Sequence, residues 1–223
     1  MKHSSQTNAQ AISQNKSQQQ SSKQLLLASK SPRRKELLAQ LGYQFTTTNS
    51  DIDESTHSNE LPQDYVLRLA IAKAQYAFNQ LSKTEQQHTL VLGSDTTVVA
   101  ESQILGKPTN EADSARMLTL LSDKAHQVFT SIAVVGKDMT KSTLVTTQVN
   151  FKALSKDEMH LYWHSAEPQD KAGSYGIQGI GGQFVKSIEG SYSAVVGLPL
   201  YETAMLLSEC GLPTSLQQKQ VIK

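Results

Sequence analysis

Two arginines stand at the start of a helix that the sequence predicts. Ser31 precedes Pro32, Arg33 and Arg34, and an apolar stripe then runs up to Gly42. Ser31 suits an N-cap because its hydroxyl can accept a hydrogen bond from the first turn, and Pro32 needs no N–H there. The first turn of a helix favours anions, so cations at this place point to an anionic ligand. Free N–H groups and two guanidinium groups would suit a polyphosphate. A solvated basic turn is the alternative.

A carboxylate, Asp95, follows an apolar stretch and Gly93, a position from which a side chain can point into a cleft. Such a carboxylate can hold a divalent cation, accept a proton from an attacking water molecule, or cap a turn. The residues alone leave these three roles open. Other charged and amide side chains also recur at the ends of predicted elements, where ligand sites tend to lie; they are Arg33, Arg34, Lys73, Lys107, Asp53, Glu54 and Gln178.

Several familiar motifs fail when their spacing is tested. The run Gly106-Lys107-Pro108-Thr109 lacks the first glycine of a phosphate loop, whose position is occupied by Glu101. His160 and His164 are four residues apart, which is a metal-ligand spacing on a helix, but no Glu follows the first as in HExxH. We interpret this pair as part of a half-exposed helix face. Ser191 and Ser193 have no GxSxG surroundings, which argues against a serine hydrolase.

Composition limits the classes of partner. The chain has 223 residues, is 38% hydrophobic and carries a net charge of +1. This length suffices for one domain with a full core or for two small lobes. The near-neutral charge argues against nucleic acid or a membrane surface as a partner, and no apolar run approaches the roughly 18 residues of a membrane span. The single cysteine, Cys210, permits no internal disulfide, which fits a reducing, cytoplasmic compartment.

The elements that must position these residues alternate between strands and helices. Apolar runs and alternation predict strands at 25–28, 43–48, 89–95, 96–100, 126–135 and 143–151, and a late hairpin with strands at 184–188 and 192–196. Caps and helical periodicity predict helices at 32–41, 62–81, 110–121, 155–164 and 199–210. In the helix at 62–81 the expected inward stripe is Tyr65, Leu69, Ala72 and Tyr76.

This order predicts an α/β fold, a long twisted mixed sheet flanked by helices, with the long hairpin strands along one side of a cleft. Three segments are expected from composition. Residues 1–23 form a Gln/Ser-rich tail too polar to fold, residues 24–212 form the folded domain, and residues 213–223 form a loose polar tail.

Four motifs, in this order, resemble the Maf family of nucleoside triphosphate pyrophosphatases. They are ASKSPRR at 28–34, GSDT at 93–96, GKP at 106–108 and KAGSYGIQG at 171–179. The resemblance covers roughly residues 25–211. The YGIQG run, followed by GSY at 190–192 and VGLP at 196–199, looks like the branch of the family that acts on dTTP and UTP.

The resemblance implies hydrolysis of a nucleoside triphosphate between its α and β phosphates, in a fold of two lobes around a central cleft, commonly as a homodimer. It places Asp95 on the family's proton acceptor. It places Arg33, Thr96 and Gln178 on positions that tune substrate choice, and Glu54, Lys73 and Lys107 on charged positions around the phosphates and a metal. We expect Ser31, Arg33 and Arg34 at the helix start to hold the triphosphate, and Glu54 and Asp95 to hold Mg²⁺ or Mn²⁺.

Lys30 departs from the resemblance, because relatives often carry Gly there. Two other functions are weighed against hydrolysis. The family has been linked with septum formation, so a nucleotide-binding regulator of cell division is one alternative. An RNA-binding protein is the other, and the near-neutral charge together with the lack of interleaved basic and aromatic residues argues against it.

Overall fold

The computed structural model of the chain describes residues 23–214 and 216, so the tails expected at 1–23 and 213–223 lie almost wholly outside the described residues. Its strands form one seven-stranded mixed sheet. The strands are β1 (Gln24–Ala28), β2 (Thr46–Thr48), β3 (Thr89–Ala100), β4 (Gln103–Leu105), β5 (Ala125–Gly136), β6 (Met139–Phe151) and β7 (Val185–Glu189). The order across the sheet is β2-β1-β3-β5-β6-β7, with β4 paired to β3.

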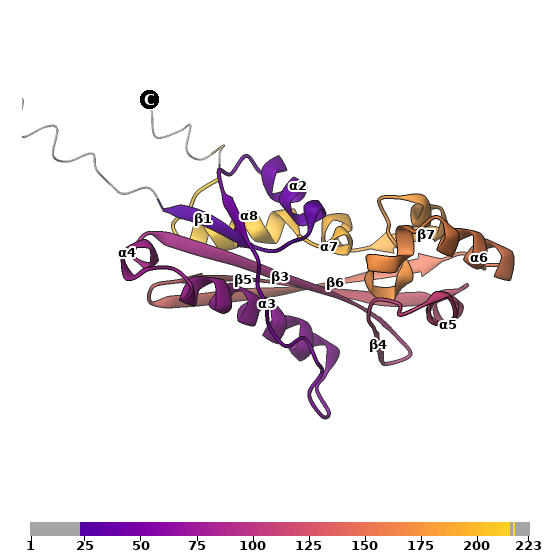
Figure 1. Cartoon of the computed structure of the whole chain (residues 1–223). Helices are drawn as coiled ribbons and strands as arrows, with labels where there is room; N and C mark the ends of the chain where they lie inside the picture. Colours follow the sequence, from indigo (N-terminus) through magenta and orange to yellow (C-terminus); the bar gives the residue numbers. More distant parts are fainter. Residues whose placement is uncertain (1–22, 215, 217–223) are drawn as a thin grey trace, which may run out of the picture.

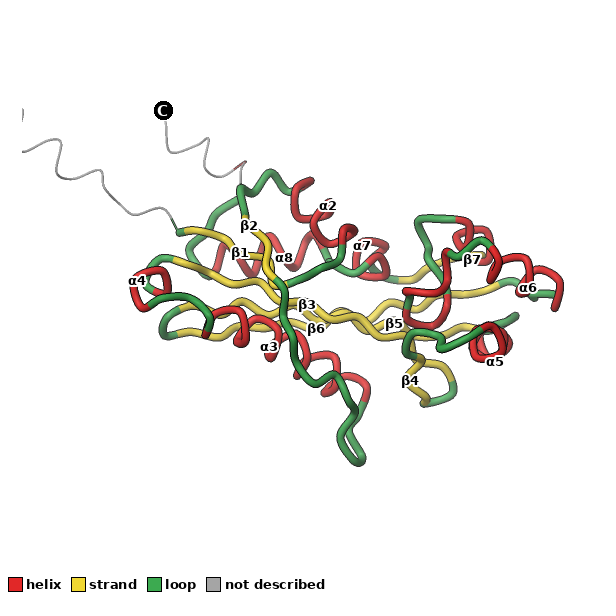
Figure 2. Tube along the Cα trace, in the orientation of Figure 1, coloured by secondary structure: helices red, strands yellow, loops and turns green. Residues whose placement is uncertain are grey.

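Helices cover both faces of this sheet (Figure 1). The α-helices are α2 (Pro32–Gln40), α3 (Pro62–Asn79), α4 (Lys83–Gln86), α5 (Glu111–Leu121), α6 (Lys156–His164), α7 (Tyr192–Val196) and α8 (Leu200–Glu209). Three 3₁₀ turns, η1 (Glu167–Asp170), η2 (Ala172–Ser174) and η3 (Ile180–Phe184), lie between α6 and β7. The long strands β3, β5 and β6 run through the whole molecule, with α2, α7 and α8 on one side and α3 on the other (Figure 2). The α/β prediction is confirmed.

Side-chain alternation along β3 assigns each residue to one of two cores. Leu90 and Leu92 pack in a cluster with residues of α2 and α8, whereas Val91 packs in a cluster with alanines of α3. Because successive side chains of a strand point to opposite faces, the same alternation continues past Gly93. Asp95 therefore lies on the α3 side, and Thr96 lies on the α2 side.

One edge of β3 is left open in the middle of the strand. The parallel pairing with β1 ends at Ala28 opposite Gly93, and the antiparallel pairing with β4 begins at Val98 opposite Leu105. Between these points, residues 94–97 have no strand partner on this edge among the described residues, although β5 pairs with their other edge. Unpaired backbone groups and the side chains beside them are thus available to a ligand.

Some predicted elements differ from the structure. The strand expected at 192–196 is the helix α7, because the Ser191 hydroxyl accepts a hydrogen bond from the Ala194 N–H (3.2 Å) and so starts a helical turn. The runs at 89–95 and 96–100 are one continuous strand, and the strand at 43–48 is limited to β2. The short strand β4 has no counterpart among the predicted elements.

The inward face of α3 also differs from the prediction. Tyr65, Ala72 and Tyr76 are only partly buried, and the helix buries Leu69 and a face of small residues around Ala70. The predicted stripe included two tyrosines, whereas the face that packs on the sheet carries alanines. Their short side chains let the helix approach the sheet closely. None of the helices within residues 23–214 combines the length and the apolar character that crossing a membrane requires.

Candidate active site

A cavity of about 840 Å³ opens at the unpaired edge of β3. It is lined by the loop between β1 and α2, the middle of β3, one face of α3, the residues after β4 and the segment 167–179. The nine side chains that were given a role in the site all line this one cavity, although they come from segments far apart in the chain; they are Ser31, Arg33, Arg34, Glu54, Lys73, Asp95, Thr96, Lys107 and Gln178. Asp53, the remaining candidate carboxylate, does not line the cavity, and its Oδ1 accepts a hydrogen bond from the Ser55 N–H (2.8 Å). The structure thus brings the predicted site residues together, and their individual roles remain predictions.

A buried ion pair occupies the α3 side of the cavity. The Lys73 Nζ atom lies 2.7 Å from Asp95 Oδ1 and 2.8 Å from Glu54 Oε1. The side chains of Lys73 and Asp95 are each only 10% exposed, whereas that of Glu54 is 55% exposed. Burial raises the pKa of the Asp95 carboxyl above its ordinary value, and the ammonium group of Lys73 and the guanidinium of Arg34 oppose that rise. A carboxylate in this setting has the character of a proton acceptor.

The closeness of Lys73 to Asp95 depends on a glycine in β3. A Cβ atom added at Gly93 would collide with the carbonyl oxygen of Ala70 and come within 2.8 Å of the Ala74 backbone nitrogen. Only a residue without a side chain therefore lets α3 lie directly on β3 at this point. Because Lys73 precedes Ala74 in α3, this close packing brings its ammonium group to the strand.

Arg34 is fixed on the opposite, α2 side of the cavity. Its Nε donates to the carbonyl of Gly197 (2.8 Å) and its Nη2 donates to Thr96 Oγ1 (3.2 Å). Ser31 caps α2 as predicted, accepting a hydrogen bond from the Arg34 N–H (3.4 Å). Burial lowers the pKa of the Arg34 guanidinium, and the nearby Asp95 carboxylate opposes that shift. Thr96, predicted to tune substrate choice, therefore also orients Arg34.

Several polar groups in the cavity have no oppositely charged or hydrogen-bonding partner among residues 23–214. Within that range the guanidinium of Arg34 bonds to two neutral oxygens, and no carboxylate of the described residues pairs with Lys30 or Lys107. The side-chain amide of Gln178 likewise makes no hydrogen bond within the described part of the chain, and its residue is exposed at the cavity wall. These free cations lie where an extended anion would find charge-assisted hydrogen bonds.

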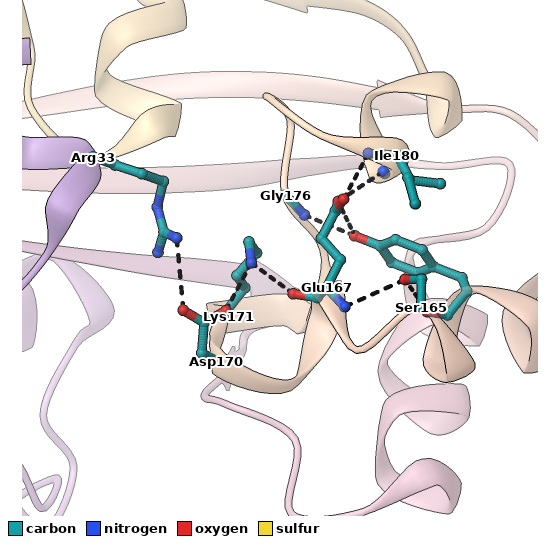
Figure 3. Close-up of polar contacts among 9 residues, drawn as sticks. Arg33, Ser165, Glu167, Asp170, Lys171, Gly176 and Ile180 are labelled. Atoms are coloured by element: carbon teal, nitrogen blue, oxygen red, sulfur yellow. Dashed lines mark hydrogen bonds and ion pairs between the residues drawn. The ribbon is translucent and has the colours of Figure 1, made fainter. Parts of the chain in front are cut away.

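The glycine-rich segment that carries Gln178 is held by a carboxylate, Glu167, as Figure 3 shows. Its Oε1 accepts hydrogen bonds from the Tyr162 hydroxyl (2.8 Å) and the Gly181 N–H (2.9 Å), and its Oε2 accepts one from the Ile180 N–H (2.7 Å). A Cβ atom added at Gly179 would collide with this carboxylate. A side chain at position 179 would therefore displace the Glu167 carboxylate from the hydrogen bonds that hold the segment.

A second contact joins this segment to the helix start across the cavity. Arg33 Nη1 lies 3.6 Å from Asp170 Oδ2, and Lys171 Nζ lies 2.7 Å from Asp170 Oδ1 (Figure 3). The Lys171 ammonium also donates to the Glu167 carbonyl oxygen (2.6 Å). Arg33 is thus partly neutralised in this structure, in contrast to Arg34.

Among the cavity-lining side chains that the sequence interpretation gave no role in the site are Tyr65, Glu167, Asp170 and Lys171. Tyr65 was assigned to an apolar stripe, but its hydroxyl donates to the Glu54 carbonyl oxygen (2.9 Å) and so supports the acidic loop. Glu167 and Asp170 precede the glycine-rich run closely enough to be suspected. Their partners, however, include backbone N–H groups and a distant arginine, which no local sequence pattern indicates.

Comparisons with known proteins bear on the family of the chain. The family model described as Maf-like protein matches residues 24–210. Three relatives carry the name dTTP/UTP pyrophosphatase. The protein of Colwellia psychrerythraea is 58% identical over 198 residues, covering 89% of this chain and 93% of the relative. That of Vibrio vulnificus is 56% identical over 185 residues, covering 83% and 97%. That of Pseudoalteromonas translucida is 58% identical over 181 residues, covering 81% and 94%.

The matched region spans β1 to α8 and thus the whole cavity and both covered faces of the sheet. All four sequence motifs lie within it, namely those at the start of α2, at Asp95, at Lys107 and around Gln178. From this match and these identities, the chain belongs to the Maf family.

Proposed function

We propose that the chain hydrolyses dTTP and UTP to the nucleoside monophosphate and pyrophosphate. The observation that carries the proposal is the cavity itself, in which unpaired cations and a buried carboxylate face each other across the open edge of β3. The names of the relatives supply the substrate class. A triphosphate brings about four negative charges, which these cations can neutralise in part.

In this proposal, different residues of the chain bind the phosphates, accept the proton and orient the proton acceptor. Arg34, Lys107 and the N-terminus of α2 hold the phosphates and align the α-phosphorus with an attacking water molecule. Asp95 accepts a proton from that water as its oxygen bonds to the α-phosphorus. The bond from the α-phosphorus to the bridging oxygen breaks, and pyrophosphate leaves with the electron pair. Lys73 keeps Asp95 oriented toward the cavity through the 2.7 Å contact.

We further propose that Glu54 and Asp95 hold a divalent cation, Mg²⁺ or Mn²⁺. Their carboxylate oxygens are the hard donors that these ions prefer. Both already attract one cation, because the Lys73 ammonium bonds to each of them. A bound metal would polarise the phosphate and lower the pKa of a coordinated water.

Gln178 is proposed to recognise the base. An amide presents a donor and an acceptor side by side, which suits the imide edge of thymine or uracil. The free amide at the cavity wall supports this role. Rotation of the amide would also suit the amino group of cytosine, so this residue alone does not reject CTP.

A substrate panel with product identification tests the proposal. The full chain is incubated with Mg²⁺ and dTTP, UTP, CTP, GTP or ATP, and the products are separated by ion-exchange chromatography. Monophosphate and pyrophosphate from dTTP and UTP are expected, and the Asp95→Asn variant should lose this turnover while it keeps its fold. Orthophosphate would contradict the proposed chemistry, and tight nucleotide binding without turnover would favour a nucleotide-dependent regulator instead.

A further inference from the structure

Two histidines and a glutamate meet on the surface where α5 packs against α6, outside the cavity. His160 Nδ1 lies 2.7 Å from Glu111 Oε1, and His164 Nε2 lies 4.0 Å from the same oxygen. The donor atoms of all three side chains lie within 4.8 Å of one another. The two imidazole rings stand edge to face, with centroids 4.4 Å apart. Three ligand-type atoms from two helices therefore converge on one point.

This convergence explains a motif that the sequence left without a role. Residues i and i+4 of a helix lie on one face, so His160 and His164 necessarily project together from α6. In the HExxH motif a glutamate follows the first histidine, but Leu161 stands at that position here. The third donor instead comes from the first turn of another helix, 49 residues earlier in the chain.

The donor atoms match the needs of zinc. Two imidazole nitrogens and one carboxylate oxygen are a recurrent zinc ligand set, with a fourth position left for water. Bonds of about 2.0–2.2 Å in a tetrahedron place ligand atoms roughly 3.4 Å apart, a value between the 2.7 Å and 4.0 Å of this cluster. Side-chain rotations would have to bring all three separations, each within 4.8 Å, to this value. The side chains are exposed, His160 by 60% and His164 by 58%, so those rotations and a coordinated water have room.

The electrostatics of α6 favour a cation at this place. His164 lies in the last turn of that helix, where the backbone carbonyl groups concentrate partial negative charge. We propose that Glu111, His160 and His164 bind a zinc ion that clamps α5 to α6. None of the three residues lines the cavity, so this site is separate from the proposed oxygen-ligated site at Glu54 and Asp95.

The two metal sites should differ in selectivity. Imidazole ligands prefer transition metals, whereas a site made of carboxylates suits Mg²⁺ or Mn²⁺. Zinc at the helix pair would hold the end of α6 that leads, through Ser165 and Ala166, into the 3₁₀ turn carrying Glu167. The clamp would therefore stabilise the support of the glycine-rich segment without touching the substrate.

Isothermal titration calorimetry with Zn²⁺ tests the site in the untagged full chain, in buffer with excess Mg²⁺. We expect zinc binding that the single variants His160→Gln, His164→Gln and Glu111→Gln each weaken by at least about 10-fold, because even outer-shell partners change metal affinity by that factor. Zn²⁺ should also raise the melting temperature of the wild type more than that of these variants. All three side chains are surface-exposed or partly so, and circular dichroism should report an unchanged fold.

The matched control is His57→Gln, which removes an exposed histidine from the loop before α3 and should leave zinc affinity unchanged. Co²⁺ gives an independent readout, because its visible absorption reports imidazole coordination. The proposal is overturned if the wild type does not bind Zn²⁺, or if the three variants bind it as tightly as the wild type does.

Discussion

Protonation of a single buried histidine should make the fold sensitive to acid. His126 of β5 is only 3% exposed, and its Nε2 lies 2.9 Å from the hydroxyl of Tyr175, which lines the cavity. The rings of Phe151 and Tyr175 stand edge-on against the imidazole. Its Nδ1 atom has no hydrogen-bond partner among the described residues. A second proton would thus place an unpaired charge among aromatic rings, and burial lowers the pKa of His126 to about 4.

The size of the effect follows from this pKa. The ordinary pKa of a histidine in an unfolded chain is about 6.5, so between pH 6.5 and about 4 the unfolded state binds the additional proton and the native state does not. The free energy of unfolding therefore falls as pH falls through this window. One pKa unit corresponds to about 1.4 kcal/mol, and the total loss attributable to His126 is about 3 kcal/mol. Above pH 7 the contribution no longer changes.

Urea unfolding of the wild type and of His126→Gln, at pH values from 7.5 to 4, measures this contribution. Glutamine is neutral throughout and can still bond to the Tyr175 hydroxyl, and all other titrating groups are common to both proteins. The wild type should lose about 3 kcal/mol more than the variant between pH 7 and 4. The exposed His57, replaced by Gln, should leave the wild-type slope unchanged. If the free energy of unfolding falls equally with pH in the wild type and in His126→Gln, the histidine does not contribute to the acid sensitivity.

Three further predictions concern the cavity. Gly93→Ala should separate α3 from β3 and lower the free energy of unfolding by about 1–3 kcal/mol. The control is Gly106→Ala, where an added Cβ meets nothing within 4 Å. It should change the free energy of unfolding by less than about 0.5 kcal/mol in the same urea titrations. Lys73→Met should lower the free energy of unfolding by about 3 kcal/mol, because it leaves the Asp95 carboxylate buried without its partner. The double variant Lys73→Met/Asp95→Asn should recover most of this loss. A double variant whose loss equals the sum of the two single losses would contradict the pairing. Arg34→Lys should lower kcat/KM for dTTP by about 10- to 100-fold, because a lysine ammonium cannot reproduce the planar fork that a guanidinium presents to phosphate. Unchanged kinetics would remove Arg34 from phosphate binding.

The elements with local start and stop markers could be predicted from the sequence. The N-cap at Ser31 and the capping box from Ser155 to Glu158 both occur as expected. Where the outcome depends on a partner far along the chain, prediction failed. The stretch at 192–196 is rich in β-forming residues, yet a serine cap and the packing of this segment on β5 and β6 make it helical.

In the site, too, features set by the local sequence were predictable and features set by distant contacts were not. The cations and carboxylates at element ends indicated a ligand site, and the open edge of β3 gathers them around one cavity. The contact between Lys73 and Asp95 was not predictable in detail, because it depends on how closely α3 approaches the sheet at Gly93. The role of Glu167 was hidden for a related reason. Its partners are backbone N–H groups, which every residue except proline possesses.

The fate of the water oxygen reports which phosphorus atom is attacked. In the proposed mechanism Asp95 takes a proton from the water molecule that attacks the α-phosphorus. Turnover of dTTP or UTP in water enriched in ¹⁸O, followed by mass spectrometry of both products, should therefore place one heavy oxygen in the nucleoside monophosphate and none in pyrophosphate. Heavy oxygen in pyrophosphate would mean attack at the β-phosphorus and would contradict the proposed alignment of substrate in the cavity.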